Sequence, residues 1–201
     1  MTSTQLERKR IPAAERRLAL LRAAAGLFAQ HGYAGTALDD VAAAAGVTKP
    51  IVYRHFDSKK ALYLALLAKH EADLPTFFER LGGAADLPDE AVVRTIVEHW
   101  LDYVRENQHA WVMLFRDSSG DEEIRAFRLR VSARARQVMG EFIAARAGVR
   151  IPAEQVEPTA ELLTSGLAGL ALWWIDHPNV PKPVMVDVAV RMSAPAVAAQ
   201  G

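Results

Sequence analysis

The spacing of apolar residues is the feature that most constrains how this chain folds. Leu18, Leu21, Ala25 and Phe28 recur at intervals of three and four residues, which places them on one face of an α-helix. Similar spacing continues along the chain, and no segment shows the alternation of apolar and polar residues that is typical of a strand. The pattern predicts an all-α protein of about nine helices.

Capping and breaking residues divide the N-terminal part into four helices. Gly32 is expected to end the first, and Thr36 to cap a short second helix over 37–45. Thr48 should cap a third helix that ends near His55. A fourth should begin at Ser58 and end at Pro75.

The remaining two thirds of the chain are also expected to be helical. A Gly82-Gly83 break precedes them, and Gly148 should end the longest helix. The expected helices cover 86–107, 109–116, 121–147, 157–176 and 183–197.

Composition and length exclude several classes of protein. With 201 residues, of which 51% are hydrophobic, the chain is long and apolar enough for a real core, and disorder is excluded. It has no cysteine, so a disulfide scaffold, a zinc-thiolate site and a cysteine nucleophile are excluded as well. The basic start lacks the apolar segment of a secretory signal, and the longest apolar stretch, 167–175, is far short of the roughly 20 residues that span a bilayer. A cytoplasmic protein is expected.

The formal net charge of zero hides a separation along the chain. Residues 1–60 contain ten basic and five acidic side chains, whereas residues 61–201 contain 14 basic and 19 acidic ones. A basic N-terminal third on an acidic remainder suggests that the N-terminal part meets nucleic acid or a membrane surface.

The expected helices over 37–45 and 48–55 fit a helix-turn-helix. Gly46 allows the tight reversal between them, and the second helix would enter a DNA major groove. Val41, Val47, Val52 and Phe56 are spaced to pack both helices against the first.

Basic and hydroxyl side chains remain on the outer side of this pair. Lys49 and Arg54 can reach acceptors on base edges, and hydroxyl or ammonium donors for phosphates come from Thr48, Tyr53 and Lys59. The alternative is an ordinary pair of packed helices with a solvated basic face.

This region also resembles the N-terminal signature of the TetR/AcrR-type transcriptional regulators, over about residues 18–67. The motifs that carry the resemblance are Gly32-Tyr33, Thr36, Asp40-Val41-Ala42, Ala45-Gly46-Val47-Thr48-Lys49, Val52-Tyr53-Arg54-His55-Phe56 and Ser58-Lys59-Lys60-Ala61-Leu62. The resemblance implies a homodimer that binds a palindromic DNA operator, usually as a repressor released by a small hydrophobic effector. It divides the chain into a helix-turn-helix domain over 1–60 and a helical effector-binding and dimerisation domain over 61–201.

The resemblance also implies which residues face DNA. They are Thr36, Thr48, Lys49, Pro50, Tyr53, Arg54, His55 and Lys59. Two positions depart from the family pattern. Ala37 replaces a frequent threonine, so one phosphate contact is expected to be lost, and Pro50 replaces a frequent glycine and removes one backbone N–H. The basic tail Arg8-Lys9-Arg10 either reaches a neighbouring groove or is disordered.

By the same resemblance, the C-terminal part holds the effector and the dimer contacts. The expected effector-binding residues are Trp100, Tyr103, Met113, Phe115, Phe127, Phe142 and Trp173. The expected dimer residues, on the last two helices, are Leu163, Gly166, Leu170, Trp174, Val188 and Met192. Ordinary core within one chain is the alternative for both sets. The arginines of the long helix, Arg128, Arg130, Arg134 and Arg136, are expected on a solvated or salt-bridged face.

Motifs of catalysis are missing from the sequence. It has no His-Glu-x-x-His, no Gly-x-Ser-x-Gly and no phosphate-binding glycine loop, and its six histidines do not cluster at metal-ligand spacing. The sequence therefore predicts a protein that is not an enzyme, with no cofactor and no metal. Two alternatives stay open: a small-molecule carrier whose N-terminal helices serve only packing, and an activator or architectural factor that still binds DNA.

Overall fold

The computed structural model describes residues 12–79, 89–116, 119–147 and 151–197. Within these ranges it contains nine helices and no strand, as the apolar spacing predicts. The helices are α1 (Ala13–Gly35), α2 (Leu38–Ala44), α3 (Lys49–His55), α4 (Lys59–Glu79), α5 (Asp89–Glu106), α6 (Gln108–Phe115), α7 (Glu122–Ala147), α8 (Ala153–Asp176) and α9 (Lys182–Val197). Of the described helices, none combines the length and apolar character needed to cross a bilayer.

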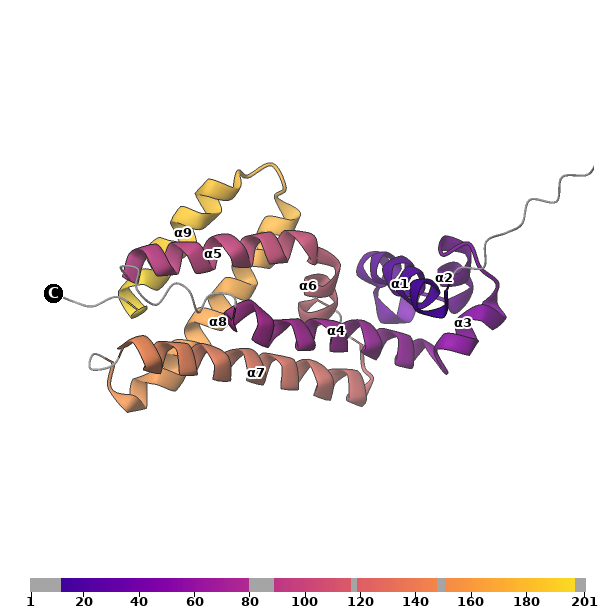
Figure 1. The fold of residues 1–201 in the computed structure, drawn as a ribbon, viewed down its shortest axis with the longest axis horizontal. Helices are drawn as coiled ribbons and strands as arrows, with labels where there is room; N and C mark the ends of the chain where they lie inside the picture. Colours follow the sequence, from indigo (N-terminus) through magenta and orange to yellow (C-terminus); the bar gives the residue numbers. More distant parts are fainter. Residues whose placement is uncertain (1–11, 80–88, 117–118, 148–150, 198–201) are drawn as a thin grey trace, which may run out of the picture.

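The molecule is elongated, with α1, α2 and α3 grouped at one end (Figure 1). Helix α4 runs from this end into a larger group of helices at the other, where α5 packs on α9 and α7 packs on α8. Helix α6 lies between the two groups and contacts both α1 and α8. The two ends are therefore joined by α4 and α6.

The observed helix bounds correct two of the expected ones. Pro75 lies inside α4, which continues to Glu79. Helix α8 begins at Ala153, so Pro158 lies inside it and does not start it. A helix can accept a proline in this way when it forgoes one backbone hydrogen bond. The Arg8-Lys9-Arg10 tail, the Gly82-Gly83 break, the expected start at residue 86 and the expected stop at Gly148 lie outside the described residues.

The first helix turns a slightly different face to the core than its sequence suggests. Leu20 is fully buried, together with Leu21 and Phe28, whereas Leu18 is 47% exposed. At 100° per residue, Leu20 and Leu18 lie on opposite edges of the stripe centred on Phe28, and the helices that pack on α1, which are α6, α4 and α2, leave the Leu20 edge buried. Gly32 breaks the helical geometry with φ of 69°, as the sequence predicts.

One hydrophobic cluster spans the α1–α3 end and part of the larger group of helices. It joins Val41 and Val52 of the short helices to Tyr63 of α4, and continues to Met113 of α6 and Ile124 of α7. The Tyr63 hydroxyl donates a hydrogen bond of 3.2 Å to the Met113 carbonyl. The predicted domain boundary at residues 60 and 61 lies in the first turn of α4 and stays a prediction.

Candidate functional site

The turn between α2 and α3 fixes the orientation of α3. Gly46 adopts φ of +65°, a conformation that favours glycine, and the Val47 amide donates 2.9 Å to the Ala42 carbonyl. Val52 is fully buried on the inner side of α3. The opposite side of α3 therefore faces away from the core, as a recognition helix requires.

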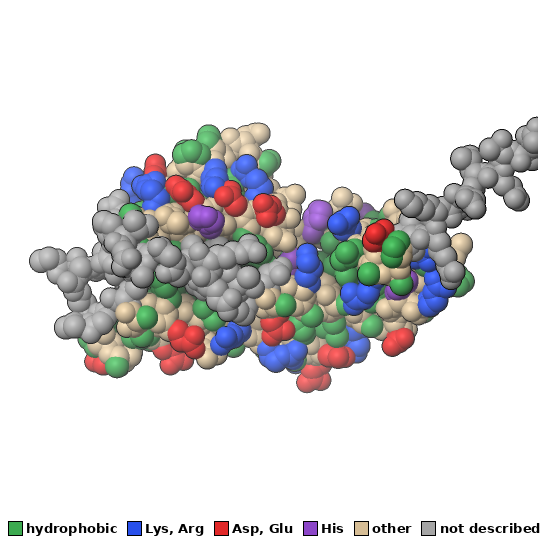
Figure 2. Space-filling view, viewed as in Figure 1, with side chains coloured by type: hydrophobic (Ala, Val, Ile, Leu, Met, Phe, Trp, Pro, Cys, Tyr) green, Lys and Arg blue, Asp and Glu red, His purple; other side chains and the backbone are tan. Residues whose placement is uncertain are grey.

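Five of the eight predicted DNA-facing residues lie together on this outer side. All of them are exposed, and they are Thr48, Lys49, Pro50, Tyr53 and Arg54. Tyr53 is 47% exposed, which is high for so large an aromatic side chain. Lys and Arg side chains also appear over the α1–α3 end of the space-filling view (Figure 2).

An ion pair between α2 and α3 holds the first of these side chains. The Lys49 ammonium donates 3.0 Å to a carboxylate oxygen of Asp39. That hydrogen bond, with the charge of Asp39, raises the pKa of Lys49 above its ordinary value. The pair orients the Lys49 ammonium. Because the pair is exposed, breaking it costs little free energy, so the ammonium can leave Asp39 and bind a phosphate or a base instead.

Thr36 does not cap α2 with its side chain, contrary to the expectation. It is 2% exposed, and its hydroxyl donates 2.9 Å to the Gly32 carbonyl and 3.2 Å to the Leu27 carbonyl. The break at Gly32 turns the chain so that Thr36 lies beneath the end of α1, and Ala37 becomes the residue that precedes the helix. The hydroxyl of Thr36 is therefore directed inward.

Lys59 is also directed toward the protein. Its ammonium donates to the Tyr33 carbonyl at 2.8 Å and the Thr36 carbonyl at 3.0 Å, and lies 4.6 Å from the centre of the Tyr33 ring. In this conformation Lys59 joins the end of α1 to the start of α4. Its contact with DNA stays a prediction.

His55 lies half-buried at the end of α3. Its Nε2 atom is buried and has no hydrogen-bond partner within the described part of the chain. Burial, followed by the charges of Arg54, Arg16 and Arg17, lowers the pKa of His55. The imidazole is therefore biased toward its neutral form despite its basic surroundings.

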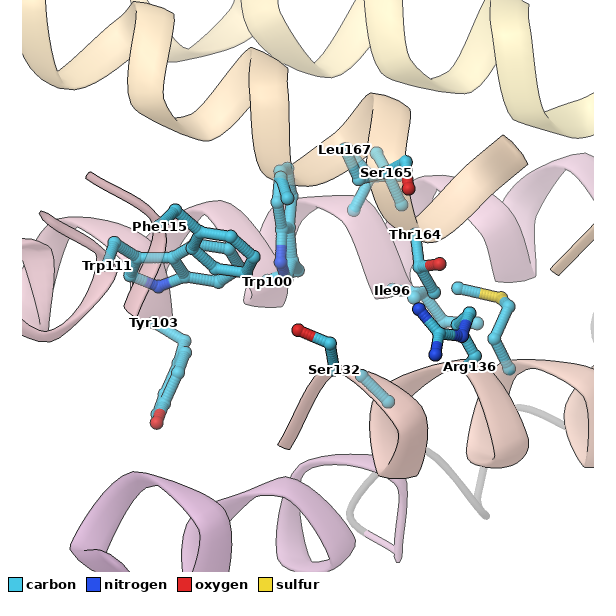
Figure 3. Close-up of a pocket in the computed structure, with 14 residues that line it drawn as sticks. Ile96, Trp100, Tyr103, Trp111, Phe115, Ser132, Arg136, Thr164, Ser165 and Leu167 are labelled. Atoms are coloured by element: carbon cyan, nitrogen blue, oxygen red, sulfur yellow. The ribbon is translucent and has the colours of Figure 1, made fainter. Parts of the chain in front are cut away.

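A cavity of about 180 Å³ lies among α5, α6, α7 and α8 (Figure 3). Three of the seven predicted effector-binding residues line it: Trp100, Tyr103 and Phe115. The other lining residues are Ile96, Val97, Trp111, Ser132, Ala135, Arg136, Met139, Thr164, Ser165, Leu167 and Ala168.

The other four predicted effector residues lie elsewhere. Met113 and Phe127 belong to the core cluster shared with α1 and α4. Phe142 packs on the separate cluster formed by α5, α8 and α9. Trp173 is exposed on α8, where its ring stacks on His177 with the ring centres 4.1 Å apart.

The cavity has two chemically different ends. At one end, Trp111 stacks on Phe115 at 5.2 Å and meets Trp100 edge-on at 5.9 Å. The close-up shows Arg136 and Thr164 at the opposite end, with Ser132 between the two groups (Figure 3). Sequence reasoning missed Trp111, although it stands one helical turn before Phe115. It placed Arg136 on a solvated or salt-bridged face, and Arg136 does form an ion pair with Glu161 while also lining the cavity.

A smaller hollow of about 60 Å³ continues from the aromatic end toward α4. Tyr103, Trp111 and Phe115 line both spaces, and His70 of α4 lines the smaller one. A molecule in the main cavity therefore lies one side chain away from the helix that leads to the helix-turn-helix.

The predicted dimer residues divide into an exposed and a buried set. Val188, Met192 and Gly166 are exposed, Leu170 is half-buried, and Leu163 and Trp174 are buried within the chain. Trp174 is 3% exposed, and its indole N–H donates 2.9 Å to the Val180 carbonyl. Exposed apolar side chains that share the outer surfaces of α8 and α9 are Leu162, Trp173, Val184, Val188 and Met192.

No group of His, Asp or Glu side chains that could hold a metal ion occurs in the part of the chain that the structure describes. The geometry thus combines an exposed helix-turn-helix with a lined cavity in a helical domain. This combination is typical of a DNA-binding regulator with a separate space for a small molecule.

Comparisons with known proteins give the family. Residues 20–66 match the model of "Bacterial regulatory proteins, tetR family". The chain is 29% identical over 187 residues to the "HTH-type transcriptional activator FasR" of Mycolicibacterium smegmatis, covering 90% of this chain and 81% of FasR. Over 37 residues it is 51% identical to IcaR of Staphylococcus aureus, a negative transcriptional regulator, covering 18% of this chain and 20% of IcaR.

Solved structures agree with the fold. A tetR-family transcriptional regulator from Streptomyces coelicolor has a TM-score of 0.70 at 26% identity, covering 91% of this chain and 80% of that one. AibR, solved in complex with isovaleryl coenzyme A and operator DNA, has a TM-score of 0.67 at 22% identity, covering 88% of this chain and 97% of that one. Residues 20–66 therefore match the TetR family, and over most of its length the chain is similar to regulators of transcription. Its relatives are regulators of transcription and not enzymes.

Proposed function

We propose that the chain binds a palindromic DNA operator as a homodimer and releases it when a small, largely apolar effector fills the cavity. The observation that carries the proposal is the outer face of α3, where Thr48, Lys49, Tyr53 and Arg54 are exposed together. Such a face offers donors to both base edges and phosphates. Because the proposed target is DNA, the proposed location is the cytoplasm.

The homodimer is supported by the outer surfaces of α8 and α9. Isolated exposed apolar residues are common on monomers, but here Trp173, Val188 and Met192 lie on two adjacent helices that also expose Leu162 and Val184. A two-fold axis through this surface would bury these side chains and present two copies of α3 to one DNA duplex. Two recognition helices would then read half-sites one helical turn apart, about 34–36 Å.

Release by the effector is supported by the path from the cavity to α4. A ligand that binds only one of two conformations shifts the population toward that conformation. If the preferred conformation moves the two copies of α3 out of step with successive major-groove turns, operator affinity falls. AibR, which has a similar fold, was solved with a coenzyme A thioester and operator DNA, which supports separate sites for a small molecule and for DNA here.

The proposed regulatory outcome is repression, which IcaR also exerts. Activation is the second candidate, because FasR is an activator and matches 90% of this chain. The two candidates differ in the effect of deleting the gene, since the regulated transcripts rise if the protein represses and fall if it activates.

A salt titration tests the proposal against the carrier alternative. The anisotropy of a labelled random-sequence duplex is recorded with the protein at several salt concentrations. A DNA-binding protein loses affinity steeply as salt rises, because phosphate contacts release counterions. Absence of duplex binding even at low salt would favour a carrier and reject the proposed function.

A further inference from the structure

The polar end of the cavity contains a single charge. Of the residues that line the cavity in the described part of the chain, Arg136 alone carries one. Its Nε lies 3.1 Å from a carboxylate oxygen of Glu161 on α8. Glu161 also accepts a hydrogen bond of 2.8 Å from the Ser165 hydroxyl, so its carboxylate is held by two neighbours.

The ion pair with Glu161 engages the Nε edge of the Arg136 guanidinium and leaves the edge with the two terminal nitrogens for a ligand. An arginine offers five N–H donors, and Glu161 engages the one on Nε. The Thr164 hydroxyl donates 2.7 Å to the Ala160 carbonyl of its own helix, so its proton is not offered to a ligand. The terminal nitrogens of Arg136 therefore remain as the ionic donors of the cavity, in a fork that matches a carboxylate.

The size and lining of the cavity limit the body of the ligand. A volume of about 180 Å³ is close to that of an engineered protein cavity of about 150 Å³ that holds benzene. Trp100, Trp111 and Phe115 line the end opposite Arg136 (Figure 3). A compact apolar body fits against these rings, with its head group toward the half-exposed Arg136.

We propose that the effector is a compact organic acid whose carboxylate binds Arg136 and whose apolar body lies against Trp100, Trp111 and Phe115. This inference rests on the proposed function, because it takes the cavity to be the effector site. A coenzyme A thioester lacks the free carboxylate and is a different ligand for this cavity, so it forms a separate arm of the test.

The test compares octanoate with octanamide, which has the same number of non-hydrogen atoms and no charge. Binding to the full-length protein is measured by calorimetry without DNA. Octanoate should bind about tenfold more tightly, as a charge-assisted hydrogen bond implies. Equal affinities, or tighter binding of octanamide or octanoyl coenzyme A, would overturn the proposal.

Two variants separate ligand binding from the role of the ion pair between α7 and α8. Arg136→Met should weaken octanoate about tenfold and leave octanamide unchanged. Glu161→Gln breaks the same ion pair but keeps the guanidinium, so octanoate should bind equally or more tightly. Arg125→Met, at an exposed position of α7, is the matched control and should bind octanoate normally.

The outcomes also distinguish this inference from the proposed function. If Arg136→Met and Glu161→Gln weaken octanoate equally, Arg136 only supports the fold and the inference fails. Because no DNA is present, a failure of operator binding would leave the octanoate result intact. Conversely, operator binding without any preference for octanoate would overturn the inference alone.

Discussion

His70 Nδ1 lies 3.1 Å from the Tyr103 hydroxyl oxygen, which joins α4 directly to the wall of the cavity. Tyr103 lines the cavity from α5, and His70 stands on the helix whose first turn contains Lys59 and Lys60. Lys59 binds the end of α1, and Lys60 binds Glu123 of α7 at 2.8 Å. A displacement of Tyr103 therefore reaches the helix-turn-helix through a single helix.

Tyr103→Phe should uncouple the cavity from the operator. The ring remains to line the cavity, but the hydrogen bond to His70 is lost. We expect ligand-free operator affinity to stay within about twofold, while the loss of affinity caused by octanoate shrinks about threefold or more, a coupling change typical of such a contact. Anisotropy titrations with and without octanoate measure both quantities.

The hydrogen bond between His70 and Tyr103 also predicts that substitutions of the two residues have non-additive effects on the octanoate response. Adding His70→Gln to Tyr103→Phe should change the octanoate response little further, because the two residues act through one contact. If the two changes reduce the response independently, the hydrogen bond is not the route between cavity and operator.

The outer face of α3 predicts the loss of operator binding in two variants. Lys49→Ala and Tyr53→Ala should each lower the operator affinity by roughly 1–3 kcal/mol per half-site. Both residues are exposed, so the melting temperature should hardly change. The measurement is a gel shift on an operator sequence recovered by selection from random DNA. The control is Arg125→Ala, at an exposed position of α7. Wild-type affinity in either variant would contradict the assignment of α3.

The exposed apolar surface of α8 and α9 predicts a monomeric variant. Met192 is 73% exposed, so Met192→Glu should raise the monomer fraction without loss of helix content. Trp174→Ala is the contrasting change, because loss of a buried tryptophan costs about 3–5 kcal/mol of folding stability. Sedimentation velocity and circular dichroism distinguish the two. An unchanged dimer in Met192→Glu would place the interface elsewhere.

The lowered pKa of Asp121 predicts how the stability of the folded state depends on pH. The Ile124 amide, 3.2 Å from its carboxylate, lowers the pKa of Asp121 below the ordinary value of 3.8, and Lys60 adds to the effect. A lowered pKa stabilises the folded state above about pH 4, and this contribution is lost as the pH falls through the folded-state pKa. Asp121→Asn keeps a good helix cap and removes the charge. Its melting temperature should fall less between pH 5 and pH 3 than that of the wild type, and an equal fall would contradict this account.

The sequence predicted most helix ends well, because turn and cap residues close to each end determine them. Gly46 takes the positive φ that the turn requires, and Ser58 accepts a hydrogen bond of 3.0 Å from the Ala61 amide as a cap. Leu18 was misplaced because the choice between two edges of one helical stripe depends on which helices pack against α1, and no local pattern contains that information.

The candidate site was less predictable because it is assembled from distant segments. The family resemblance suggested that Thr36 and Lys59 face DNA. The break at Gly32 instead brings the Thr36 hydroxyl under α1 and the Lys59 ammonium onto the last carbonyls of α1. Arg136 stands among several arginines of α7, and only its distance to Glu161 on α8 distinguishes it. Trp173 and Trp174 are adjacent, and only the packing of α9 decides which of them is buried.

Selection of bound DNA from a random pool shows directly whether a homodimer reads DNA with α3. The recovered sequences should contain a palindrome whose half-site centres are one helical turn apart, about 10–10.5 base pairs, or a multiple of it. Lys49→Ala and Tyr53→Ala should fail to enrich it. Recovery of no common sequence, or of a single site without two-fold symmetry, would contradict a homodimer that reads DNA with α3.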